Sequence, residues 1–226
     1  QYDMIQGEDK GQARNLLADN ITEQGTIDPV IPYEWKLTHV PFENKFTDVT
    51  EKDWFHDVVL ELAASGVVNG MTETTFEPQG TLTRAEFATM LYRVSYAPVV
   101  TGESTYSDVK TGDWYYNAVV WATEAGVVNG MGDGTFAPND NITRQEMATM
   151  LYRLAKAEKV EEDKLASFPD AASVADWAQD AMHWAVSTEI VNGSTHDDKV
   201  NYLDPTATAL RCQAAAVACR YLALSK

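Results

Sequence analysis

Three arginines recur at corresponding places in three similar stretches of the chain: Arg84, Arg144 and Arg211. Each is expected at the first position of a helix, where any exposed residue would serve. A guanidinium group keeps its charge and presents a fixed fork of donors, so the chemistry these positions suggest is recognition of an anion. The repeated choice of arginine therefore indicates a bound ligand, with an ordinary exposed helix start as the alternative.

Two of these arginines follow a threonine and precede a glutamate at helix-capping distance. In a capping box the threonine oxygen accepts from a free N–H of the first turn, and the glutamate accepts from the N–H of the threonine. We expect this capping role for Thr83 with Glu86 and for Thr143 with Glu146. The third stretch has Leu210 and Gln213 instead, so it is predicted to lack the box, and the placement of Arg211 is less secure.

Other chemistry finds no support in the sequence. There is no Gly-x-Ser-x-Gly, His-Glu-x-x-His or phosphate-loop motif, and the four histidines are scattered. Cys212 and Cys219 would lie roughly 10 Å apart on one helix, too far for a disulfide, and they have no zinc-site spacing. Asp133-Gly134 is typical of a turn rather than a calcium loop. We predict no catalytic residue, no metal and no cofactor.

Composition excludes several partners. The 226 residues are 45% hydrophobic, which is typical of a folded chain. A net charge of −17 argues against nucleic acid. No run of about 18 apolar residues exists, so no membrane insertion is expected. The chain begins at Gln1 without an initiator Met, which predicts a processed or cut piece.

The arginines belong to units that repeat along the chain. The first two copies are offset by 60 residues throughout, and the third carries insertions, chiefly in the 194–200 loop. We assign the repeats to residues 46–100, 101–164 and 165–226. Residues 1–45 differ from the rest and are interpreted as an arm or the tail of a preceding domain. Tyr33, Trp35 and Leu37 alternate with polar residues, which is typical of a strand.

Each unit is predicted to be helix, loop, helix. The first helices should begin near Asp53, Asp113 and Asp176 and end at a glycine such as Gly66. Each helix carries an apolar stripe, in the first unit Trp54, Val58, Val59 and Leu62, then Phe87, Met90, Leu91 and Val94. One unit cannot bury both stripes, so three should pack about a common axis. The predicted fold class is mostly α, pseudo-threefold, with a short mixed or extended N-terminal segment.

The order Phe-x-Asp-Val, Trp, Gly-Val-Val-x-Gly, Thr-Phe-x-Pro, Thr-Arg-Ala-Glu resembles the S-layer homology domain in three tandem copies over 46–226. This resemblance implies a central bundle of second helices, with the first helices as prongs and ligand in the grooves between them. It further implies a non-catalytic bacterial cell-surface anchor that binds a secondary cell-wall polysaccharide, usually pyruvylated.

The resemblance also implies which residues line the grooves. The three arginines would meet the carboxylate of the pyruvyl ketal, which suits a guanidinium fork. Aspartates would accept sugar hydroxyls, with capping or turn closure as the alternative for them. Turn glycines would let the sugar approach the backbone, and tryptophans would line groove walls or fill the core. The residues are Asp48, Asp108 and Asp170; Gly70, Gly130 and Gly193; and Trp54, Trp114 and Trp177.

Three expectations complete the hypothesis. The third groove, which loses its cap, should be weak or empty. The net charge opposes an acidic glycan, so cations must gather locally around the grooves. One alternative is a protein-interaction module that meets its partner through its acidic face or, by strand addition, through residues 33–40. Another is the targeting end of a larger exported enzyme or S-layer protein.

Overall fold

The computed structural model of the protein describes residues 43–161 and 164–224. Within them lie six α-helices: α2 (His56–Ala64), α3 (Arg84–Val94), α4 (Tyr116–Glu124), α5 (Arg144–Leu154), α6 (Gln179–Ser187) and α7 (Arg211–Leu224). The mostly helical class is confirmed. The predicted strand around Tyr33 and the interaction segment 33–40 lie outside the described residues.

The second helices begin where the capping pattern predicts. Thr83 Oγ1 accepts from the backbone N–H of Glu86, whose carboxylate accepts from the N–H of Thr83, and Thr143 repeats this with Glu146. The third helix keeps half of the device, because the Leu210 N–H donates to Gln213 Oε1 at 3.2 Å. The complete box is absent there, because Leu210 has no side-chain acceptor, but glutamine replaces the acceptor that glutamate supplies.

The first helices begin later than predicted, at His56, Tyr116 and, after a short 3-10 turn, Gln179. The aspartates expected at their starts serve another purpose in the first two repeats. Asp53 Oδ2 accepts the Thr50 N–H at 2.7 Å, and so closes the turn that precedes the helix. The predicted glycine end is confirmed, because Gly66 follows α2 with a left-handed φ of 73°.

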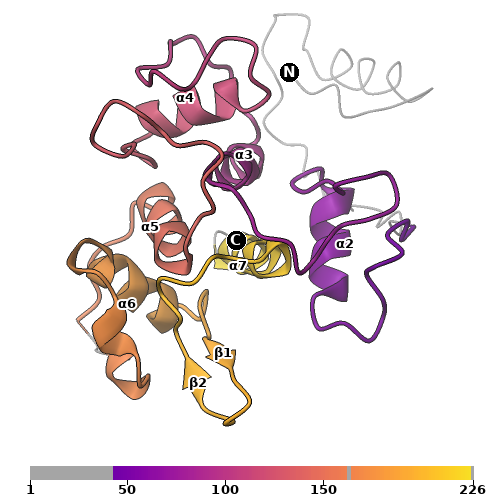
Figure 1. Cartoon of the computed structure of the whole chain (residues 1–226), viewed down its shortest axis with the longest axis vertical. Helices are drawn as coiled ribbons and strands as arrows, with labels where there is room; N and C mark the ends of the chain where they lie inside the picture. Colours follow the sequence, from indigo (N-terminus) through magenta and orange to yellow (C-terminus); the bar gives the residue numbers. More distant parts are fainter. Residues whose placement is uncertain (1–42, 162–163, 225–226) are drawn as a thin grey trace, which may run out of the picture. The chain divides into compact units, whose positions relative to one another are not determined.

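The helices of one repeat do not pack mainly on each other. The first helix of each repeat packs on the second helix of the preceding repeat: α4 on α3, α6 on α5, and α2 on α7 (Figure 1). The last contact joins the third repeat to the first. This exchange buries the apolar stripes that no single repeat could cover, and the three repeats close into a ring.

Backbone hydrogen bonds close the same ring at its centre. The N–H of Leu82 donates to Ala209, that of Ala209 to Ile142, and that of Ile142 back to Leu82, over 2.8 to 3.0 Å. Each of these residues lies two positions before its helix, α3, α5 or α7, and none is more than 1% exposed. The starts of the three second helices are therefore fixed to one another.

The third repeat carries the irregular elements. Three 3-10 helices, η1 (Leu165–Ser167), η2 (Ala171–Ser173) and η3 (Asp176–Ala178), precede α6. The predicted insertion forms a hairpin of β1 (Ser194–Thr195) and β2 (Asn201–Tyr202), paired antiparallel with Ser194 opposite Tyr202. Among the described residues, no helix is long and apolar enough to cross a membrane.

Candidate binding site

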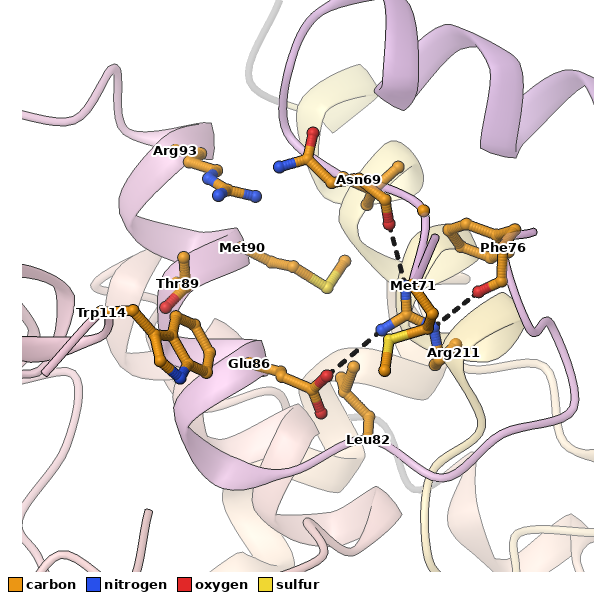
Figure 2. A pocket seen from close by; sticks show the side chains of 12 residues that line it. Asn69, Met71, Phe76, Leu82, Glu86, Thr89, Met90, Arg93, Trp114 and Arg211 are labelled. Atoms are coloured by element: carbon orange, nitrogen blue, oxygen red, sulfur yellow. Dashed lines mark hydrogen bonds and ion pairs between the residues drawn. The ribbon is translucent and has the colours of Figure 1, made fainter. Parts of the chain in front are cut away.

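Three pockets of one design lie around the ring. Each combines the Asn-Gly turn and second helix of one repeat with an arginine from the preceding repeat and a tryptophan from the following one. The first pocket, of about 180 Å³, includes Gly70, Glu86, Arg93, Arg211 and Trp114 (Figure 2). The second, of about 400 Å³, includes Gly130, Glu146, Arg153, Arg84 and Trp177. The third, of about 440 Å³, includes Gly193, Gln213, Arg220, Arg144 and Trp54.

The three predicted arginines line the pockets but are largely buried. Their side chains reach into the neighbouring repeat, where the Nε of each donates to a backbone carbonyl: Arg84 to Phe136, Arg144 to Leu203 and Arg211 to Phe76. They are 6%, 7% and 9% exposed. The neighbouring repeat covers the first turn of each helix, so a position that would be exposed on one unit becomes part of the interface.

Two of these arginines also form ion pairs inside their pockets. Arg84 Nη1 lies 2.8 Å from Glu146 Oε1, and Arg211 Nη1 lies 3.4 Å from Glu86 Oε1. Arg211 donates in addition to the Asn69 carbonyl at 2.9 Å, as Figure 2 shows. The side chain predicted to be least secure is thus held by three partners. Each capping glutamate serves both its own helix and the arginine of the preceding repeat.

The predicted aspartates hold the loop that receives these arginines. Asp48 accepts the N–H groups of Phe76 and Glu77 at 2.8 and 2.7 Å, one on each carboxylate oxygen. Glu77 has a left-handed φ of 59°, so the Thr-Phe-x-Pro segment turns here instead of running extended. Asp108 and Asp170 make the same paired contacts in their repeats. This matches the turn-closing role that the sequence left open beside sugar binding.

The predicted glycines line the pockets, and the chain itself already requires them. A Cβ on Gly70 would lie 2.6 Å from the ring of Phe46 and 2.6 Å from the Thr75 carbonyl. Gly130 has a left-handed φ of 65° and would meet the ring of Tyr106 in the same way. The absence of a side chain is thus needed for the aromatic residue that opens each of these repeats, and it also leaves the turn's backbone accessible to the pocket.

The tryptophans that open the first helices lie at the surface. Trp54, Trp114 and Trp177 are 62%, 65% and 57% exposed, so their predicted place in the apolar stripe was wrong. They precede the observed helix starts, which explains why they leave the stripe. Each lines the pocket of the preceding repeat. Of the two alternatives for these residues, the structure places them along groove walls and not in the core.

A second set of arginines was missed from the sequence. Arg93, Arg153 and Arg220 line the first, second and third pockets, each from the far end of the second helix. Each lies nine residues after a predicted arginine, so the recurrence that drew attention to the first set was present here too. Each donates to the carbonyl of an apolar residue that follows a first helix, as Arg93 does to Val67 at 3.3 Å.

Arginines of this acidic chain gather in the pockets. All six arginines among the described residues line one of them. Burial lowers the pKa of Arg93, Arg144, Arg153 and Arg211, but a guanidinium keeps its proton at neutral pH. A buried cation with spare donors attracts an anion strongly, because little solvent screens it. The described residues contain no cluster suited to a metal ion.

These features describe a ring of three repeats with a cationic pocket at each junction, and the comparisons with known proteins agree. The S-layer homology domain model matches residues 45–88, 105–148 and 167–197, and the chain belongs to that family. The third match stops before α7, although α7 makes the same kinds of contact as α3 and α5.

The relatives include enzymes and surface proteins. An amylopullulanase of Thermoanaerobacterium thermosulfurigenes is 38% identical over 78% of this chain and 9% of its own length. An exoglucanase of Acetivibrio thermocellus is 37% identical over 76% of this chain and 16% of its own. A surface-layer protein of Lysinibacillus sphaericus is 34% identical over 69% and 13%. The chain thus spans less than a fifth of these relatives.

Membership settles the general role. S-layer homology domains are non-catalytic modules that anchor proteins at the cell surface, and in related proteins they bind cell-wall polymers. The location at the cell wall or S-layer follows for this chain.

Proposed function

We propose that the chain anchors its protein by binding an acidic cell-wall polysaccharide, pyruvylated on its sugars, in the pockets between repeats. The observation that carries the proposal is the gathering of all six arginines of the described residues into three pockets of an acidic protein. A pyruvyl ketal bears one carboxylate, and an arginine that is only partly engaged can bind it with its remaining donors.

The rest of each pocket suits a sugar. An exposed indole ring supplies a flat apolar face in the same pocket as the cations, as Trp114 does in the first pocket (Figure 2). The glycine turn leaves backbone groups accessible. Local cations also remove the conflict with the net charge of −17, since attraction at short range does not depend on the sign of the whole protein.

The experiment should spare the arginines that hold the repeats together. Replacing Arg84 and Arg144 would disturb the ring, so we choose Arg93→Ala with Arg153→Ala, whose side chains lie at the pocket walls. Retention on purified pyruvylated wall polysaccharide should weaken at least about tenfold. Lys52→Ala with Lys110→Ala removes the same charge from exposed positions outside the pockets and should change retention little.

Removing pyruvyl groups from the polysaccharide by mild acid provides the second arm. The intact chain should lose most of its retention on the treated polymer. Retention that survives both the arginine substitutions and the acid treatment would refute the pyruvyl-binding proposal. We propose the same anchoring whether the module serves an exported enzyme or a surface-layer protein, since both occur among the relatives.

A further inference from the structure

The third pocket differs from the other two in charge. The first and second pockets each contain two arginines and one glutamate, a formal charge of +1. In the third pocket Gln213 stands where Glu86 and Glu146 stand, and the two arginines, Arg144 and Arg220, leave a formal charge of +2.

The loss of the glutamate leaves Arg144 without an acidic partner. Its Nε donates to the Leu203 carbonyl at 2.7 Å, and among the described residues no acceptor meets its two terminal nitrogens. In the other two pockets Nη1 is held by a glutamate, that of Arg84 by Glu146 and that of Arg211 by Glu86. Arg144 is 93% buried, being 7% exposed, and it lines the pocket. The terminal nitrogens of Arg144 are therefore donors that an anion in the pocket can bind.

The nearest carboxylates do not fill this role. Asp170 and Asp204 act on Arg144 from beyond ion-pair distance, and neither lines the pocket. Both oxygens of Asp170 accept backbone N–H groups, and Asp204 Oδ2 lies 2.9 Å from His196 Nε2. After the glycine turn the third pocket has Ser194 and Thr195 where the other two have Met71 and Met131. Ala216 in turn replaces the threonine that lines each of the other pockets, Thr89 or Thr149.

We propose that the third pocket is the strongest anion site of the three and takes a dianionic group, such as the phosphate monoester of a glycan, between Arg144 and Arg220. The first two pockets, with half the formal charge, take the monoanionic carboxylate. This inference rests on the proposed function only in assigning binding to the pockets. It reverses the expectation that a lost cap leaves the third groove weak, because the substitution that removes the glutamate also frees the arginine.

Each pocket contains its own reporter for a test. The indole N–H resonances of Trp54, Trp114 and Trp177, assigned with Trp→Phe variants, follow the third, first and second pockets respectively. The whole chain is titrated with inorganic phosphate at pH 8, where phosphate is mostly dianionic, at constant ionic strength with chloride as control. Trp54 should respond with a Kd about tenfold lower than those of Trp114 and Trp177. When acetate, a monoanion, replaces phosphate, the Kd values at the three tryptophans should differ less.

Paired substitutions test the cause. Gln213→Glu should restore the ion pair with Arg144 and raise the Kd at Trp54 about tenfold, to the level of the other pockets. Glu146→Gln should lower the Kd at Trp177, and glutamine can still accept the backbone N–H, as Gln213 does. Responses at Trp114 and Trp177 that equal or exceed the response at Trp54 would overturn this inference alone. No response at any of the three to either anion would count against the pockets as anion sites, and so against the proposed function as well.

Discussion

The first two pockets and the third share one backbone and differ in one charge. In all three an aspartate holds a loop, the loop carbonyl receives an arginine, and a tryptophan from the next repeat forms a wall. The acidic partner of the arginine changes, from Glu86 and Glu146 to Gln213. The comparison teaches that the loop carbonyl alone can position the arginine, and that neutralising its charge is a separate task of the glutamate.

Replacing the buried arginine should have the largest effect on stability, and the loss should be greater in the first pocket than in the third. Arg211→Ala leaves the Phe76 and Asn69 carbonyls and the Glu86 carboxylate without their donor, and should cost about 3 kcal/mol. Arg144→Ala leaves only the Leu203 carbonyl and should cost about 1 to 2 kcal/mol. Urea unfolding followed by circular dichroism measures both. Equal losses would mean that the ion pair adds nothing to the difference between the pockets.

Replacing the loop aspartate should destabilise the first and the third repeat equally. Asp48→Asn and Asp170→Asn each replace one of two accepting oxygens by an amide that cannot accept, at a cost of about 2 kcal/mol. The same unfolding measurement should give values within about 0.5 kcal/mol of each other, with the exposed Asp197→Asn as control. A much smaller loss for Asp170 would show that the third pocket has a different framework, not just a different charge.

Removing a helix cap should have the smallest effect on stability. Thr143→Ala should cost about 1 kcal/mol, because the Glu146 N–H loses its acceptor. Amide hydrogen exchange at Glu146 should then rise toward that of Gln213, because Leu210, which precedes α7, has no side-chain acceptor. The exposed Thr208→Ala serves as control. Unchanged exchange at Glu146 would indicate that the ring, and not the cap, protects these helix starts.

Local patterns predicted the local structure well. The capping boxes, the glycine helix ends and the buried stripe of Phe87 and Leu91 follow from short-range rules that need no knowledge of the partner. The recurrence of arginine marked three residues that line the pockets. It would also have marked Arg93 and Arg153, had the comparison been carried through to the end of the helix.

What the sequence could not show was set by contacts between repeats. Two apolar stripes per repeat indicate that packing is needed, but they do not say that α4 covers α3 or that α2 covers α7. The burial of Arg84 comes from that exchange, since its helix alone would leave it exposed. The double acceptance by Asp48 depends on a loop 28 residues away, and no local pattern reports it.

The ring of hydrogen bonds among Leu82, Ile142 and Ala209 also limits how such a protein can gain or lose repeats. An open array of repeats can add a unit at either end, because each new unit meets only its neighbour. A closed ring has no free end, so a fourth copy would have to break the contact between the last repeat and the first. Deleting one copy would uncover helix faces on two repeats at once. The number of repeats is therefore fixed by geometry at three, and stronger attachment must come from altering the pockets or joining whole rings.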